Sequence, residues 1–161
     1  MLVVAHGLGR HPTEWLACAR AIDANAIVPD LPQLRRDDAP PDHAAAIAVL
    51  VGALDDSGGG AATWLGHSGG AHLVLDAAVA HPDRVEALVL VAAAPRRSVL
   101  AQVTCPVLVI HGELAPIVMA PQDNVELVAI ATAIHDPHLE AADAFVEVVR
   151  AFRERAADRR R

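Results

Sequence analysis

The sequence predicts a single α/β domain built on a doubly wound, mostly parallel sheet of about six strands with helices on both faces. Six short apolar runs, rich in Val, Leu, Ile and Ala, alternate with stretches that have helical periodicity. Strands that are apolar along their whole length are typical of parallel sheets covered by helices on both sides. Because 161 residues suffice for one domain with its own core, we expect one domain over residues 1–161.

The expected elements follow one another in regular alternation along the chain. The runs that predict strands are 2–6, 26–29, 62–66, 87–93, 106–111 and 126–131. The segments that predict the helices between them are 11–22, 42–55 and 69–80. A last helix is expected over 138–155, with one apolar face made of Leu139, Phe145, Val149 and Phe152.

The order of these elements predicts where a ligand would bind. Ligands of such sheets bind beyond the carboxyl ends of the strands, at the point where the winding reverses direction. If the second strand lies outside the first and the third lies on its other side, the reversal falls between the first and third strands. The loops that follow these two strands are "HGLGR" at 6–10 and "GHSGG" at 66–70.

The composition excludes several classes of partner. A net charge of −7 argues against a nucleic-acid surface, which needs clustered cations. No apolar run is long enough to span a bilayer, and the start has neither a basic region nor a cleavage signal. Cys18 and Cys105 have no metal-ligand spacing and form no disulfide framework. We therefore expect a soluble, cytoplasmic protein without nucleic-acid or membrane partners.

The stretch "WLGHSGGAHLVL" carries the strongest chemical signal. It places Ser68 in a Gly-x-Ser-x-Gly frame, from Gly66 to Gly70, between an apolar strand and an apolar helix. Small residues two before and two after the serine allow the strained, tight turn that lifts a nucleophilic hydroxyl above a sheet. The pattern predicts that Ser68 is a nucleophile.

With its flanking segments, this motif resembles the α/β-hydrolase family over nearly the whole chain. "AHGLGRHPTEW" is similar to the family's oxyanion loop, "AIVPDLPQL" to the strand and loop after it, and "ELVAIATAIHDPHLE" to the last strand and the catalytic histidine loop. The resemblance implies Ser68 as nucleophile, His135 as general base, and the N–H groups of Leu8 and Gly69 as the oxyanion hole. An imidazole is needed because a serine hydroxyl is a poor nucleophile until a base takes its proton.

The third member of the triad departs from the family pattern. Family members usually carry Asp three residues beyond the Gly that ends the penultimate strand, and counting from Gly112 reaches Ala115. About fourteen residues separate Gly112 from the last strand, so we expect a clipped or absent crossover helix. Glu113 is our candidate acid, Asp123 in the shortened connection is a second one, and a site without any acid is the third alternative.

Two further departures concern the substrate. Residue 1 already lies at the strand that leads to the oxyanion loop, so we expect the family's two opening strands to be missing, and we expect the usual lid to be reduced to "PRRSVLAQVT" at 95–104. These features indicate a minimal, lidless serine hydrolase that cleaves small carboxylic esters or thioesters through an acyl-enzyme. The resemblance implies no metal and no organic cofactor. The sheet edge left by the missing strands would allow a homodimer.

Two rival interpretations can be weighed from the residues. A dinucleotide-binding fingerprint would use "HGLG" and Asp30, but its third glycine fails because Pro12 stands three residues after Gly9. The other rival is an impaired or non-hydrolytic relative of the same fold that binds a small molecule. Ala115 favours this second rival, whereas the intact Ser68 and His135 oppose it.

Overall fold

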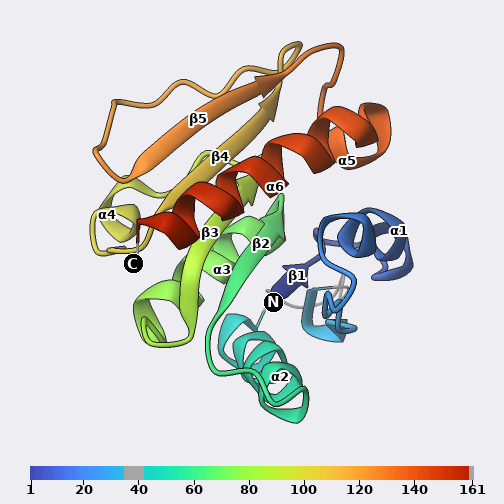
Figure 1. Ribbon diagram of the computed structural model, residues 1–161, viewed down its shortest axis with the longest axis vertical. Helices are drawn as coiled ribbons and strands as arrows, with labels where there is room; N and C mark the ends of the chain where they lie inside the picture. The colour runs from blue at the N-terminus through green and yellow to red at the C-terminus, as the bar shows by residue number, and fades with distance from the viewer. Residues whose placement is uncertain (35–41, 160–161) are drawn as a thin grey trace.

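The protein folds around one five-stranded parallel sheet with the strand order β1-β2-β3-β4-β5 (Figure 1). The computed structural model describes residues 1–34 and 42–159. The strands are β1 (Leu2–Ala5), β2 (Ala62–His67), β3 (Val85–Val91), β4 (Val107–Gly112) and β5 (Val125–Ile130). All neighbouring strands pair in parallel, so the predicted fold class is confirmed and every carboxyl end lies at one edge of the sheet.

The expected strand over 26–29 is reduced to an isolated bridge between Ile27 and Val3. The N–H of Val4 donates to the carbonyl of Ile27 (2.9 Å), and the N–H of Ile27 donates to the carbonyl of Leu2 (2.8 Å). This segment therefore lies on the outer side of β1, while β2 pairs with the other side. The reversal of winding falls at β1 and β2, as the sequence predicts, although the regular sheet has five strands.

The first three helices lie in the first three intervals that the sequence predicts to be helical, whereas a short helix after β3 and a 3-10 turn were not predicted and the last helix differs from the prediction. They are α1 (Thr13–Ile22), α2 (His43–Asp56), α3 (Gly69–Ala80), α4 (Arg97–Leu100), α5 (Pro137–Glu140) and α6 (Ala142–Asp158), with a 3-10 turn at Pro32–Leu34. The expected last helix is broken at Ala141, so Leu139 is 54% exposed and its predicted place on the apolar face is wrong. Within the described ranges, no helix has the length and apolar character needed to cross a membrane.

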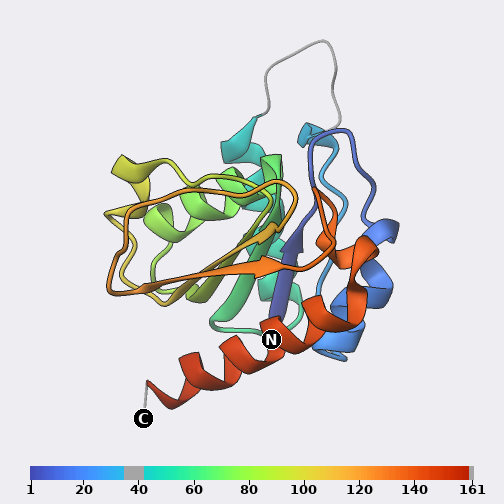
Figure 2. The same ribbon diagram turned by 90° about the horizontal axis from the view of Figure 1, so that it is seen from above.

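Helices lie on both faces of the sheet (Figure 2), and an apolar layer fills the space between the sheet and the helices on each face. Leu2 and Val4 of β1 pack on one face with α1 and α6, whereas Val3 and Ala5 pack on the other face with α2 and α3. Alternate residues of a strand point to opposite faces, so both sets must be apolar when helices cover both sides. This explains why the strands read as continuous apolar runs.

The connection from β4 to β5 contains no helix, as its length predicts (Figure 1). It runs as an irregular segment over residues 113–124, so one face of the edge strand β5 has no helical cover. Leu127 is 43% exposed as a result. Because the crossover has no helix, β5 lacks a covering helix on one face, whereas helices cover both faces of the sheet at β1 and β2.

Candidate active site

Ser68 occupies a strained turn between β2 and α3. Its backbone has φ 53° and ψ −116°, a combination that residues other than glycine rarely adopt. Such a conformation costs on the order of 1–3 kcal/mol and persists only where the surroundings impose it. Here the N–H of Ser68 donates to the carbonyl of Val91 (2.8 Å), which ties the turn to the end of β3.

The two glycines of the motif are required by close backbone contacts. A Cβ on Gly66 would overlap the backbone of Gly70, and a Cβ on Gly70 would overlap the carbonyl oxygen of Ala5. The first turn of α3 therefore rests directly on the end of β1. This packing forces the chain to turn sharply at Ser68, which explains the spacing of the small residues.

Leu8 and Gly69, the two predicted oxyanion donors, lie side by side. A Cβ on Gly69 would overlap the Leu8 side chain, so the loop after β1 touches the start of α3. In the part of the chain that the structure describes, neither the N–H of Leu8 nor that of Gly69 donates to a backbone or side-chain acceptor. Two free amides next to a serine are what an oxyanion hole requires.

The loop after β1 is held in place by His6, which is fully buried. Its Nδ1–H donates to the carbonyl of Gly7 (3.0 Å), and its Nε2 accepts from the N–H of Leu31 (3.1 Å). The N–H of Gly9 also donates to the carbonyl of Leu34 (3.0 Å). His6 thus supports the loop rather than facing the substrate.

His135 lies in the loop after β5 and is brought to the same edge of the sheet as Ser68. Its ring centroid is 5.0 Å from that of His67, the residue that precedes the serine. The Nε2–H of His67 donates to the main-chain carbonyl of His135 (2.9 Å). His135 is exposed and Ser68 is half-buried, and among the described residues no hydrogen bond joins the two side chains.

The main chain around His135 is fixed on both sides by carboxylates that the sequence analysis did not single out. Glu140 Oε2 accepts from the N–H of Ile134 (2.8 Å) and from the N–H of Asp136 (3.2 Å). The Asp136 side chain forms an ion pair with Arg10 (2.6 Å) from the loop after β1. The only signal for Asp136 in the sequence is its position beside His135, and nothing in the sequence pairs it with Arg10.

Trp15 of α1 forms the buried support beneath these loops. Its ring stacks on His138 at 3.7 Å with an interplanar angle of 9°, and it also lies against His67 and Phe145. Burial lowers the pKa of His138 to about 3 and also lowers the pKa of His67. Both imidazoles are therefore neutral at physiological pH.

His67, Asp136 and His138 form a cluster whose ligand-type atoms lie within 4.8 Å of one another. Zinc would need these atoms about 2 Å from a common centre. Two of the three side chains are already engaged, because Arg10 binds Asp136 and the Nε2–H of His67 points at the His135 carbonyl. A guanidinium on the only carboxylate disfavours a cation, so the arrangement suits a hydrogen-bonded network better than a metal site.

Glu113, the candidate acid, lies in a loop that adjoins the His135 loop. A Cβ on Gly112 would overlap the carbonyl oxygen of Ala133, and the N–H of Leu114 donates to that oxygen (3.1 Å). The Glu113 side chain is nevertheless exposed, and within the described ranges it makes no hydrogen bond or ion pair. Ala115 is exposed in the same turn.

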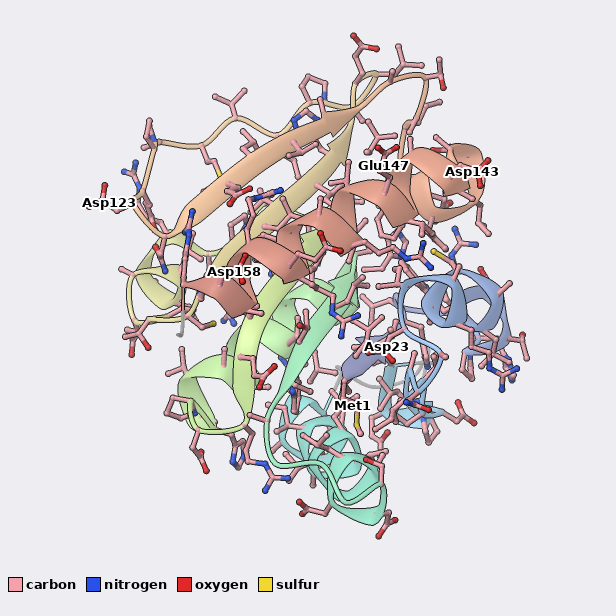
Figure 3. The ribbon with its side chains drawn as sticks, viewed as in Figure 1. Met1, Asp23, Asp123, Asp143, Glu147 and Asp158 are labelled. Carbon is pink, nitrogen blue, oxygen red and sulfur yellow. The ribbon has the colours of Figure 1, made fainter. Side chains whose placement is uncertain are left out.

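Asp123 lies at the amino ends of the strands, opposite to the carboxyl ends where Ser68 lies, so the prediction of Asp123 as an alternative acid is wrong. It borders a surface groove with Val85, the first residue of β3, and Pro106, which precedes β4. In Figure 3 it stands at the outer end of the β4–β5 connection, just before β5 begins. Parallel strands all start at this edge, whereas Ser68 follows the carboxyl end of β2.

The sequence of the first 108 residues matches the family model described as "alpha/beta hydrolase fold", which covers more than half of the chain. The chain belongs to the α/β-hydrolase fold family. The match contains β1, the elbow at Ser68 and β3, and it ends within β4. No curated protein sequence matches the chain.

Several solved structures share this fold at low sequence identity. A marine microorganism esterase is 16% identical with a TM-score of 0.76, and the match covers 94% of each chain. NosK from Streptomyces actuosus is 20% identical with a TM-score of 0.76, covering 97% of this chain and 98% of its own. A predicted CIB-like hydrolase from Thermoplasma acidophilum is 18% identical with a TM-score of 0.75, covering 94% and 84% respectively.

Proposed function

We propose that this protein is a serine hydrolase that cleaves small carboxylic esters or thioesters. Ser68 is the nucleophile, His135 is the general base, and the N–H groups of Leu8 and Gly69 form the oxyanion hole. Glu113 is the proposed third member of the triad, since its loop adjoins the His135 loop and its carboxylate is unpaired among the described residues. The observation that carries this proposal is the strained backbone of Ser68 beside two free amides.

The reaction follows from these roles. Ser68 Oγ attacks the substrate carbonyl while His135 takes the hydroxyl proton, and the two amides stabilise the oxyanion that develops. When the tetrahedral intermediate collapses, His135 returns the proton to the leaving alkoxide or thiolate. Water then attacks the acyl-enzyme with His135 again as base, which releases the carboxylic acid and restores Ser68.

The restricted size of the substrate follows from the reduced segment after β3. Only the four-residue helix α4, Arg97–Leu100, lies between β3 and β4, where a lid domain would otherwise supply apolar walls. A site with few walls buries little of a long acyl chain, so it gains little binding energy from one. We therefore assign short or compact acyl groups to this enzyme.

The first experiment is intact-mass labelling with a fluorophosphonate. The native chain should gain one adduct, and Ser68→Ala should gain none. Ser98→Ala is the matched control, because Ser98 is exposed in α4 and its hydroxyl makes no hydrogen bond within the described ranges. An adduct that persists in Ser68→Ala, or a folded native chain that never reacts, would contradict the proposal.

Glu113→Gln decides the role of the acid. Disabling the orienting carboxylate of a triad lowers turnover by up to about 10⁴. A strong loss of ester turnover in this variant would support Glu113 as the acid. Turnover within about threefold of native would mean that Glu113 is not the acid and that Ser68 and His135 act as a catalytic pair.

A second candidate function is non-hydrolytic binding of a small molecule in the same site. The substitution of Ala115 for the family aspartate favours it, as does the lack, within the described ranges, of a hydrogen bond between Glu113 and His135. If the native chain is folded yet forms no adduct, this second function is preferred, and thermal-shift screening of small carbonyl compounds is the direct test.

A further inference from the structure

We propose that Asp136 is a positioning residue: through its ion pair with Arg10, it fixes the position of the His135 main chain relative to the oxyanion loop after β1. This inference rests on the proposed hydrolase function. It concerns the two residues that connect the loop after β1 to the loop after β5, which lie 126 positions apart in the chain.

The first step is that the backbone of His135 is held by contacts other than those of its ring. Its carbonyl accepts from His67 Nε2–H (2.9 Å), and the amides on either side of it donate to Glu140. Within the described ranges, by contrast, neither nitrogen of the His135 ring has a hydrogen-bond partner. In this structure the position of His135 is therefore set by contacts of its main chain.

The second step is that Asp136 lies at the centre of these contacts. Its Oδ2 accepts from Arg10 (2.6 Å), and its Oδ1 lies 3.3 Å from His67 Nε2 without a hydrogen bond, because that proton is directed at the His135 carbonyl. One carboxylate thus touches both the residue before the nucleophile and the loop after β1. Displacing it would move the loop that carries His135.

The third step concerns charge. The Arg10 and Asp136 side chains are 37% and 20% exposed, so the pair is only partly screened by water. His67 is neutral because burial lowers its pKa, so it does not compensate the negative charge of the Asp136 carboxylate. Arg10 supplies the compensating charge, which anchors Asp136 beside the loop containing Leu8. An asparagine of the same shape would bind Arg10 more weakly.

The fourth step links the ion pair to the missing family acid. A carboxylate on the ring normally both orients the histidine and stabilises its cation. Ala115 stands at the usual position, and within the described ranges no hydrogen bond joins Glu113 to the His135 ring, so contacts of the main chain must place the loop before any carboxylate can orient the ring. The Arg10–Asp136 pair constrains both loops that border Ser68. A shift of about 1 Å in such a group can cost on the order of 10²-fold in rate.

The test compares Asp136→Asn, Arg10→Met and the double variant with the native enzyme, measuring kcat and KM on a short chromogenic ester. Glu14→Gln is the matched control, because Glu14 is a second ion-pair partner of Arg10 (3.0 Å) and, among the described residues, makes no hydrogen bond or ion pair with the His135 loop. Arg10→Lys tests rescue, since it keeps the charge and loses only the planar geometry.

We expect each single variant to lower kcat by roughly tenfold or more with KM within about twofold, and Glu14→Gln to stay within about twofold in both constants. The double variant should be no slower than the slower single variant, and Arg10→Lys should recover part of the loss. Additive losses in the double variant, or native kcat in Asp136→Asn, would overturn the inference.

Hydrogen exchange separates this inference from the proposed function. Asp136→Asn should speed exchange of the main-chain amides on either side of His135, at positions 134 and 136, by about threefold or more, and the amides of α3 should be unchanged. If the native chain does not react with fluorophosphonate but exchange still changes, the hydrolase proposal fails and the positioning contact stands. If exchange near His135 is unaltered, the positioning role is refuted whatever the activity.

Discussion

Leu8 lies directly over Gly69, so a Cβ on Gly69 would overlap Leu8 Cγ and stand 2.9 Å from its Cδ1. The two residues are far apart in the sequence, yet their backbone N–H groups must converge on one oxygen atom if the site is an oxyanion hole. The absence of a side chain at position 69 is what permits this approach.

Gly69→Ala should therefore lower ester turnover while the protein stays folded. The new methyl group would push the Leu8 side chain and its N–H away from the oxyanion position. Complete loss of one donor costs about 10²–10³ in kcat, so we expect a partial loss of roughly tenfold from this displacement. Steady-state kinetics on the variant provides the measurement, and an unchanged kcat would contradict the expected displacement of the Leu8 N–H.

Gly52→Ala is the matched control and a prediction in its own right. Gly52 lies inside α2, and a Cβ there would meet no atom within 4 Å. Replacing a helical glycine with alanine in open space removes chain entropy from the unfolded state and should stabilise the protein by about 0.5–1 kcal/mol. Urea denaturation should show a higher midpoint with unchanged turnover, and a lower midpoint would contradict the geometry of α2.

Gly112→Ala should destabilise the protein and displace the His135 loop. A Cβ at this position would overlap the carbonyl of Ala133 and lie 2.5 Å from that of Ile134, both of which are backbone atoms that cannot rotate away. We expect a loss of unfolding free energy of about 2 kcal/mol or more and, in the remaining folded protein, much slower fluorophosphonate labelling.

Gly60→Ala is the control for that variant, because a Cβ on Gly60 would meet no atom within 4 Å. Chemical denaturation gives the stability of each variant, and labelling below the unfolding transition gives the reactivity. Equal stability of the two variants would show that the end of β4 and the His135 loop are not packed as described.

His138 should make the unfolding free energy depend on pH. Burial lowers its pKa to about 3 in the folded protein, whereas an unfolded chain has a histidine pKa near 6.5. The unfolded chain therefore binds the extra proton first as pH falls. The stability contribution is fully present above about pH 6.5 and is lost progressively toward pH 3, at up to about 1.4 kcal/mol per pH unit.

His138→Phe should remove this dependence and keep the stack on Trp15. The variant also eliminates two buried ring nitrogens that have no hydrogen-bond partner in the described part of the chain. We expect it to be at least as stable as native at pH 7 and clearly more stable at pH 5. Urea denaturation at both pH values is the measurement, and an equal acid sensitivity in the two proteins would disprove the assignment.

Local patterns in the sequence determined the parallel sheet and the turn at Ser68. Apolar runs of strand length, helical periodicity between them and small residues flanking the serine each act over a few positions, so they can be interpreted without the tertiary structure. The same reasoning predicted the clipped β4–β5 crossover from its length and placed His135 after the last strand. It failed for Leu139, because the helix breaks at Ala141 and turns that residue outward.

Only the tertiary structure decided which distant residues meet. It placed Asp123 at the amino edge of the sheet, away from Ser68, and it brought Arg10 to Asp136 across 126 positions of the chain. Such pairings depend on how the layers pack and on which charges remain uncompensated at loop ends, and no short-range pattern encodes them. The sequence therefore determined the fold and the strained turn at Ser68, whereas packing between the loops decided which contacts hold the main chain of His135.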